Sequence, residues 1–267
     1  MNVRELALRV INDVNIKQAY ANIVLNKLFP KHQINEQDRR FITELAYGTI
    51  KVGKTLDWIL NRYMSRPLNK ISPIIQDILR MGAYQILFMD KVPDSAACNQ
   101  SVELAKKYGH IGTAKLVNAV LRNIIRHPEK AAYPTPEEDS ALYLSLKYYH
   151  PLWMVERWIK KIGKADTEKL CAFNNCPPDL SIRTNLLKIT REALIKRLHS
   201  EGAEAVPSLL TPEGILCKKH TTLTNMASLH EGLFQVQDES SMLVAHVLAP
   251  QEGEFIIDTC SAPGGKS

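Results

Sequence analysis

Apolar residues recur at steps of three and four through the first 130 residues, and this spacing constrains the fold more than any other feature of the chain. It places the apolar side chains on one face of a helix, where neighbouring helices can bury them. The alternation typical of strands does not occur before about Pro134. The pattern predicts helices at about 3–14, 21–28, 35–63 with a break near Gly48 or Gly53, 73–87, 94–105 and 114–125. We therefore expect an all-α helical domain over residues 1–130.

The pattern changes after residues 131–139, which are rich in proline and acidic residues and typical of a linker. Helical spacing returns at 142–149, again after Pro151, and once more after Asp166, a residue type preferred at helix N-termini. Alternation then predicts strands near 180–185, 204–206, 214–218 and 232–236, with a helix at 190–198. This mixture favours a small α+β (ferredoxin/RRM-like) domain with a helical lead-in over residues 140–231.

Basic residues are concentrated in the first half of the chain. The net charge is +6, and residues 1–130 hold 20 Lys and Arg against 11 Asp and Glu. This asymmetry is typical of polyanion binding, although a solvated helical surface would explain it as well. No apolar run approaches the ~18 residues that span a bilayer, and no apolar block marks a signal peptide, so we expect a cytoplasmic protein without membrane contact.

The five cysteines are scattered and odd in number, which argues against a disulfide framework. None stands in a C-x-x-C pair or beside spaced histidines, so we expect no metal site. Cys98, Cys171, Cys176 and Cys217 are interpreted as small buried apolar side chains. Cys260 differs because it lies in a glycine-rich loop.

That loop follows apolar residues 255–257, which end in Asp258. We expect a buried strand over 255–258 that opens a Rossmann-like α/β domain beginning at residue 232. In such folds a glycine-rich turn lets a nucleotide-like ligand approach the backbone. A phosphate-binding P-loop is a weak alternative, because it requires glycine where Cys260 stands. The sequence ends at Ser267, before the expected helix, so we interpret it as truncated.

Longer strings identify a family. Asp258-Thr-Cys-Ser-Ala-Pro-Gly-Gly-Lys-Ser267 resembles motif I of the RNA 5-methylcytosine methyltransferases, with serine replacing the usual alanine at 261 and threonine at 267. The string from Gln235 to Ser241 resembles the element that precedes motif I. The strings at 38–49, 78–86, 101–106 and 117–122 are similar to NusB-like RNA-binding domains. Together these features resemble the RsmB/Sun (Fmu) family over essentially the whole chain.

This resemblance implies methylation of C5 of a cytosine in small-subunit ribosomal RNA by the intact protein, with S-adenosyl-L-methionine as the methyl donor. It implies that a cysteine thiolate adds to C6 of the base, and that both catalytic cysteines lie downstream of this sequence. The chain then has no catalytic residue of its own, and we expect it to be inactive as a fragment. Cys260 is implied to line the cofactor site. The cofactor-binding candidates are Asp258, Cys260, Ser261, Ala262, Pro263, Gly264, Gly265 and Lys266.

The expected partner is small-subunit ribosomal RNA rather than DNA, and the sequence indicates no oligomeric state. The candidate RNA-binding residues are Arg4, Arg9, Arg39, Arg40, Lys106, Lys107 and Arg122. Arg39 and Arg80 could instead pair with helix carboxylates and have structural roles. The alternative function is a non-catalytic NusB-like module that binds RNA in antitermination.

Overall fold

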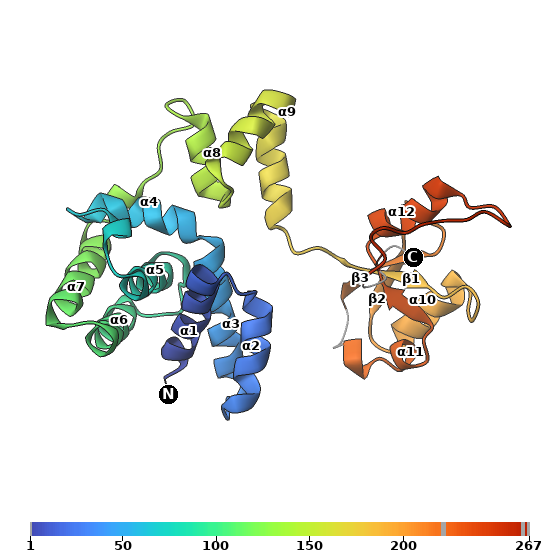
Figure 1. The fold of residues 1–267 in the computed structure, drawn as a ribbon, viewed down its shortest axis with the longest axis horizontal. Coiled ribbons are helices and arrows are strands. Elements are labelled where there is room, and N and C mark those ends of the chain that lie inside the picture. Colours follow the sequence, from blue (N-terminus) through green and yellow to red (C-terminus); the bar gives the residue numbers. More distant parts are fainter. Residues whose placement is uncertain (1, 220–222, 263–264, 266–267) are drawn as a thin grey trace. The chain divides into compact units, whose positions relative to one another are not determined.

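The computed structural model describes residues 2–219, 223–262 and 265. The chain divides into two compact units, Met1–Asn175 and Cys176–Ser267, each with its own hydrophobic core. The first unit is helical, as the apolar spacing predicts (Figure 1). Its α-helices are α1 (Val3–Lys17), α2 (Ala21–Leu28), α3 (Glu36–Lys51), α4 (Gly53–Tyr63), α5 (Pro73–Phe88), α6 (Asp94–Tyr108), α7 (Ile111–Arg126), α8 (Ser140–Tyr148) and α9 (Leu152–Asn175). Short 3-10 turns follow α2, α4 and α7 at Phe29–Lys31 (η1), Leu68–Lys70 (η2) and Pro128–Ala131 (η3).

Local sequence sets where several of these helices begin. The side chain of Asn2 accepts a hydrogen bond from the backbone N–H of Arg4 at 3.1 Å, and Asn35 accepts one from Asp38 at 2.8 Å. Both bonds satisfy N–H groups that the first turn of a helix leaves unpaired. Pro73 occupies the first turn of α5, where its missing N–H costs nothing.

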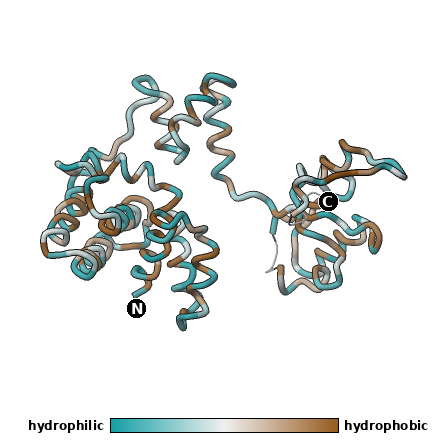
Figure 2. The backbone as a smooth tube through the Cα atoms, viewed as in Figure 1, coloured by the Kyte–Doolittle hydropathy of each residue, from teal (hydrophilic) through white to brown (hydrophobic). Residues whose placement is uncertain are grey.

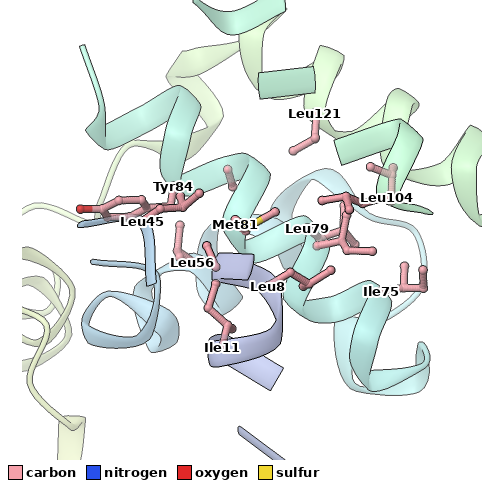
Figure 3. Packing of buried hydrophobic residues seen from close by; sticks show 14 of the residues in the cluster. Leu8, Ile11, Leu45, Leu56, Ile75, Leu79, Met81, Tyr84, Leu104 and Leu121 are labelled. Carbon is pink, nitrogen blue, oxygen red and sulfur yellow. The ribbon is translucent and has the colours of Figure 1, made fainter. Parts of the chain in front are cut away.

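Helix α5 is the centre of the helical unit. It contacts α1, α3, α4, α6 and α7, and hydrophobic and hydrophilic residues alternate along the surrounding helices (Figure 2). Figure 3 shows the resulting core, in which α5 presents buried side chains to its neighbours. The labelled residues come from α1 (Leu8, Ile11), α3 (Leu45), α4 (Leu56), α5 (Ile75, Leu79, Met81, Tyr84), α6 (Leu104) and α7 (Leu121). Each fully buried Leu, Ile or Met stabilises the fold by roughly 1.5–3 kcal/mol through burial of apolar surface.

Helices α8 and α9 pack on each other around Leu144, Val155 and Cys171. Two helices were expected between Pro151 and residue 177, with the second beginning at Asp166. The structure has a single element there, interrupted at Gly163, whose φ of 78° lies in the left-handed region. Glycine adopts this conformation without the clash that a Cβ would introduce, so the break falls at Gly163 and not at Asp166.

The second unit is an α+β fold with an antiparallel sheet in the order β2-β3-β1-β4. Its strands are β1 (Leu180–Thr184), β2 (Glu204–Pro207), β3 (Gly214–Lys219) and β4 (Phe234–Val236). Helix α10 (Arg191–Ser200) connects β1 to β2, and α11 (Ala227–His230), preceded by the turn η4 (Leu223–Asn225), lies between β3 and β4. This β-α-β-β-α-β sequence of elements is that of ferredoxin-like folds, so the predicted α+β class is confirmed.

One face of the sheet packs against α10. Its core contains Ile182 of β1, Leu194 and Leu198 of α10, Ile215 of β3 and Phe234 of β4. Ile182 and Ile215 are directly paired across the two central strands. Helix α12 (Glu239–Leu248) follows β4 and contacts β1.

The strand expected over residues 255–258 is not formed. These residues are irregular, and the side chains of Phe255 and Ile257 are 89% and 72% exposed. A strand is stabilised by the ladder and side-chain pairs it makes with a neighbour, and no strand of the described residues pairs with this segment. The prediction of a buried strand was therefore wrong for this structure, and the Rossmann-like domain remains a prediction.

The expected domain boundaries also remain predictions. Strand β4 belongs to the same sheet as β1, although residue 232 was expected to begin the next domain. Helices α8 and α9, expected as the lead-in to the small domain, group with the first unit.

Candidate RNA-binding residues and cofactor loop

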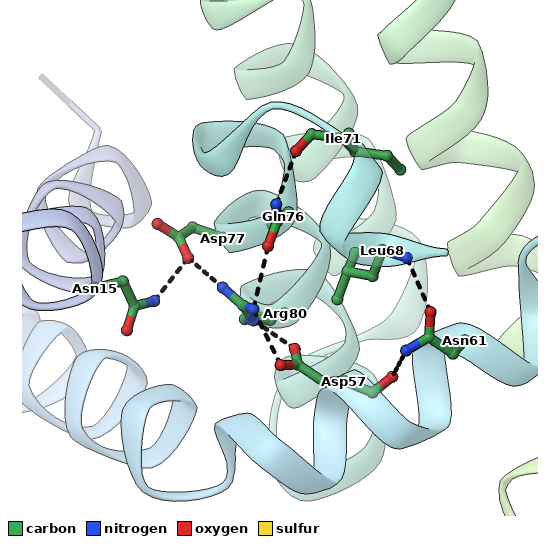
Figure 4. Close-up of polar contacts among 8 residues, drawn as sticks. All are labelled: Asn15, Asp57, Asn61, Leu68, Ile71, Gln76, Asp77 and Arg80. Carbon is green, nitrogen blue, oxygen red and sulfur yellow. Dashed lines mark hydrogen bonds and ion pairs between the residues drawn. The ribbon is translucent and has the colours of Figure 1, made fainter. Parts of the chain in front are cut away.

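Arg80 lies at the centre of a polar network in the helical unit (Figure 4). Its Nε and Nη2 donate to the two carboxylate oxygens of Asp57 at 2.6 and 3.1 Å, and its Nη1 donates to Asp77 Oδ1 at 2.9 Å. Asp77 is fully buried and also accepts hydrogen bonds from Asn12 and Asn15. Burial opposes the charge of Arg80, but the bonds to both carboxylates outweigh it and raise its pKa. Arg80 therefore joins α5 to α4, which confirms its structural role.

Arg4 is also engaged within the protein. Its Nε donates to Gln85 Oε1 at 2.7 Å, and its guanidinium lies 5.1 Å from the centre of the Phe41 ring. Burial lowers the pKa of Arg4. These contacts join α1 to α5 and α3, so the side chain is only partly available to an external ligand.

Lys107 contacts a buried carboxylate. Its Nζ donates to Glu5 Oε1 at 2.7 Å, and the hydroxyl of Tyr108 donates to the same oxygen at 2.6 Å. Burial raises the pKa of Glu5, but the two hydrogen bonds outweigh burial and hold it below its usual value. The bond to Glu5 raises the pKa of Lys107. Lys107 thereby joins α6 to α1, while its side chain stays 59% exposed.

The remaining RNA-binding candidates are exposed on four helices, α1, α3, α6 and α7. Arg40 pairs with Glu36 one turn earlier in α3, and Lys106 pairs with Glu103 in α6 at 2.6 Å. Exposed pairs of this kind contribute little to stability, so the cations can exchange partners at low cost. Arg39 stacks over the ring of Phe29 at 4.8 Å and pairs with no carboxylate in the described part of the chain.

Arg9 of α1 and Arg122 of α7 are also exposed. Within the described residues, neither forms an ion pair. Of the seven candidates, Arg4 and Lys107 join helices, and Lys107 is also exposed, like the other five. The sequence-based selection missed Lys27 and Lys31, which lie with Arg9 around a cavity. A signal was present, because the two lysines stand four residues apart around Pro30.

The loop expected to bind the cofactor is open in the structure. Asp258 Oδ1 accepts a hydrogen bond from the backbone N–H of Cys260 at 2.8 Å, which closes a tight turn. Both side chains are exposed, as are Ser261 and Ala262. The candidates Pro263, Gly264 and Lys266 lie outside the described residues.

Gln237 connects this loop to the sheet. Its Nε2 donates to the carbonyl oxygen of Gly265 at 3.0 Å. Its Oε1 is buried and has no donor in the part of the chain that the structure describes. Gln237 lies in the string that precedes the loop motif, so the structure brings together two segments that the sequence singled out separately.

Cysteine burial differs from expectation at one position. Cys98, Cys171 and Cys217 are buried, and burial raises the pKa of Cys217 to about 11. Cys176 is exposed, so its assignment as a buried apolar residue was wrong.

Across the described ranges, no three His, Cys, Asp or Glu side chains are arranged to hold a metal ion. No helix in those ranges is both long and apolar enough to cross a membrane.

Comparison with known proteins finds two domain matches along the chain, the second of which begins before the boundary between the two units. Residues 1–126 match the NusB family, and residues 150–224 match the ferredoxin-like domain of RsmF/B-like methyltransferases. A solved structure described as the crystal structure of PH0851 aligns with 100% of this chain and 60% of its own, with a TM-score of 0.69 and 23% identity. At that identity the likeness shows the fold alone.

Named relatives match over the whole chain. A probable ribosomal RNA small subunit methyltransferase B of Synechocystis is 36% identical over 268 residues, and one of Bacillus subtilis is 35% identical. The matches cover 100% of this chain but only 60% and 59% of these relatives. Over its whole length the chain is therefore similar to proteins named ribosomal RNA small subunit methyltransferase B, and its two parts match the NusB family and the RsmF/B-like ferredoxin-like domain.

Proposed function

We propose that the intact protein methylates C5 of a cytosine in small-subunit ribosomal RNA, with S-adenosyl-L-methionine as the methyl donor. The observation that carries this proposal is the string from Asp258 to Ser267, in a chain whose whole length matches methyltransferase B relatives. In this proposal the helical unit binds RNA and the loop contributes to the cofactor site. The proposal also implies a cytoplasmic location, because ribosomal RNA lies in the cytoplasm of bacteria such as Synechocystis, the source of one relative.

The described loop residues are compatible with such a cofactor. A Cβ built at Gly265 meets no atom within 4 Å, so a ligand can approach the backbone there. One oxygen of Asp258 is bonded to Cys260, which leaves the other oxygen exposed to a ligand. The unpaired Oε1 of Gln237 can accept a hydrogen bond from a ligand N–H or O–H. We assign cofactor contact to Asp258, Cys260, Ser261, Ala262, Pro263, Gly264, Gly265 and Lys266; the cofactor supplies the methyl group.

We further propose that the 267-residue chain alone does not transfer methyl groups. A nucleophilic cysteine must be accessible, and Cys98, Cys171 and Cys217 are buried. The exposed Cys260 lies in the cofactor loop, where its backbone N–H fixes Asp258. The other exposed cysteine, Cys176, lies between α9 and β1, outside this loop, and the proposal assigns the attack on the base to neither Cys176 nor Cys260.

RNA binding by the helical unit rests on its basic surface. The candidates are Arg4, Arg9, Arg39, Arg40, Lys106, Lys107 and Arg122, and binding through them weakens steeply as salt is raised. The candidates differ in the contacts they make within the helical unit. Arg122→Ala should weaken RNA binding without changing stability. Arg4→Ala should also lower the stability of the helical unit, because it removes the hydrogen bond to Gln85 of α5 and the contact with Phe41 of α3.

The test is the methylation state of the ribosomal RNA in cells. Deleting the gene should abolish one 5-methylcytidine in small-subunit RNA, measured by mass spectrometry of RNA fragments. The wild-type gene should restore it, and a gene carrying Asp258→Ala should not. Glu252→Ala is the matched control, because Glu252 is an exposed acidic residue close to the loop.

One observation favours a second function. Residues 1–126 match the NusB family, and this part of the chain does not include the loop. A non-catalytic RNA-binding module acting in antitermination would leave methylation unchanged when the gene is deleted. It would instead alter read-through of transcription terminators. An unchanged 5-methylcytidine pattern in the deletion strain would refute the methyltransferase proposal and leave this one.

A further inference from the structure

The first part of α9 carries a tryptophan together with basic residues on the side that faces away from α8. Helix α9 packs against α8 (Figure 1), and Val155 and Ile159 lie in that contact, so they define its inward face. An α-helix turns by about 100° per residue, which places Trp153, Arg157 and Lys160 within an arc of about 60° on the other side of the helix. All three side chains are exposed, and they form the outward face of α9.

Trp153 has no structural partner that explains it. Its side chain is 60% exposed, and within the described residues no aromatic or cation–π contact includes it. Trp158, on the same helix, differs because it packs against the α8–α9 core and its ring lies 5.5 Å from that of His150. A single exposed apolar side chain is common on protein surfaces, so the residues around Trp153 decide whether it marks a site.

The cations around this position have no carboxylate partner. Arg157, Lys160 and the adjacent Lys161 are exposed, and none of them forms an ion pair in the part of the chain that the structure describes. In residues 152–163 they stand against one carboxylate, Glu156, so this segment has a net charge of +2. The guanidinium and ammonium groups are thus available to an anionic partner.

An exposed ring among unpaired cations favours one kind of anion. In a duplex the faces of the bases are stacked on each other, and proteins contact mainly phosphates and 2′-hydroxyls, which would use the cations alone. In a single strand a base can stack on an aromatic ring while neighbouring phosphates contact the cations. Trp153 and Lys160 are seven residues apart, about 10 Å along the helix, so a short stretch of one strand can contact both.

We propose that the outward face of α9 binds a single-stranded segment of RNA, with a base stacked on Trp153 and phosphates contacting Arg157 and Lys160. This inference rests on the proposed RNA-binding function and adds a contact that the seven candidates do not include. The contact also lies outside residues 1–126, the part of the chain that matches the NusB family.

The first test measures binding of the 267-residue chain to a fluorescent single-stranded RNA and to the duplex of the same sequence. Trp153→Ala should bind the single strand roughly 5- to 150-fold more weakly, because the stacking of one base is lost, and should bind the duplex like wild type. Phe173→Ala is the matched control, because Phe173 is a 75% exposed aromatic residue of the same helix beyond the break at Gly163. Trp153→Phe keeps a ring and should retain most of the affinity, whereas Trp153→Leu should not.

A second variant tests the cations. Arg157→Ala with Lys160→Ala should lower the salt dependence of single-strand binding by about 1.4 in slope, for two lost phosphate contacts at about 0.7 each. Arg66→Ala with Lys70→Ala is the control, because it removes the same charge from exposed residues of the same unit outside α9. Thermal unfolding followed by circular dichroism, unchanged in each variant, verifies that the helical unit is folded.

The outcomes separate this inference from the proposed function. If Trp153→Ala binds like Phe173→Ala while wild type binds RNA, the inference alone is overturned. Equal weakening of duplex and single strand by Trp153→Ala overturns the single-strand assignment. Competition by polyglutamate or by anionic phospholipid vesicles as effective as by unlabelled RNA would make an acidic protein or a membrane surface the partner instead. No RNA affinity in wild type at low salt would refute both the inference and RNA binding by this chain.

Discussion

Replacing Arg80 by methionine should destabilise the helical unit by about 3–4 kcal/mol. Methionine keeps most of the length of the side chain but removes every donor that contacts Asp57 and Asp77. Removing one partner of a buried ion pair costs about 3–5 kcal/mol, because the other charge is left buried without compensation. The Arg80 side chain is only 16% exposed and that of Asp77 only 1%, so little solvent screening reduces this cost.

Two features place the effect at the lower end of that range. Asp77 keeps its bonds from Asn12 and Asn15, at 3.0 and 2.7 Å. Asp57 is 27% exposed, so water can replace part of what Arg80 supplied. Arg80→Lys should be costly too, because an ammonium cannot reproduce the bidentate contact with Asp57.

Tryptophan fluorescence in a urea titration measures this effect without interference from the second unit. All three tryptophans, Trp58, Trp153 and Trp158, lie in the first unit. Arg66→Met is the control, since Arg66 is exposed and should change the unfolding free energy by less than about 0.5 kcal/mol. Adding Asp77→Asn to Arg80→Met should recover part of the loss by removing the buried charge. A loss below about 1 kcal/mol for Arg80→Met would refute the reasoning.

Two further perturbations test the same unit. Gly48→Ala should cost about 1–3 kcal/mol by urea titration, because its Cβ would lie 2.0 Å from the hydroxyl of buried Tyr84. Gly53→Ala, with nothing within 4 Å, should be neutral or stabilising, and equal losses for the two would contradict this explanation. Glu5→Gln should cost about 1–3 kcal/mol near neutral pH. Because the folded pKa of Glu5 lies below its ordinary value of 4.5, the difference from wild type should be complete above about pH 4.5 and shrink as the pH falls below it. A pH-independent difference between pH 3 and 7 would show that the carboxylate charge is not responsible.

The helices could be predicted because their signals are local. Apolar spacing and caps such as Asn35 act within a few residues, and the structure places α3 directly after that cap. Strand β1 was predictable for a related reason, since its sequence alternates between apolar and polar residues and its burial alternates from Ser181 to Thr184. The break in α9 was misplaced because the cap signal of Asp166 was followed instead of that of Gly163, although glycine commonly ends helices in the left-handed conformation.

The roles of the basic residues could not be read from the sequence. Arg4 and Lys107 look like any surface cation on a basic helix, but their partners Gln85 and Glu5 are 81 and 102 residues away in the chain. Only the packing of α1 against α5 and α6 brings these pairs together. Arg80 could be suspected of a structural role, although its bidentate contact with Asp57 depends on how α4 crosses α5.

The strand expected over residues 255–258 shows that an apolar segment alone does not predict a buried strand. Three consecutive apolar residues before an acidic one are typical of a buried strand, but burial requires a neighbouring strand and covering helices. Neither covers this segment within the described residues, and Phe255 and Ile257 remain exposed. The segment is apolar, as its sequence states, but its sequence does not show which strand and helices would bury it.

This exposure bears on the proposed cofactor site. Fixing the backbone of one residue costs roughly 1–2 kcal/mol, so holding residues 255–258 in a single conformation costs about 4–8 kcal/mol. When a strand lies in a sheet, its ladder and side-chain burial offset that cost before any ligand arrives. Among the described residues, the loop is held by the hydrogen bond between Asp258 and Cys260 and by the hydrogen bond from Gln237 to Gly265. The contacts of a cofactor with this loop would have to offset the rest of the ordering cost. Each 1.4 kcal/mol of binding free energy used to order the loop weakens the observed binding tenfold. Affinity for the proposed cofactor therefore depends on the packing of residues 255–258 as much as on the residues that touch the ligand.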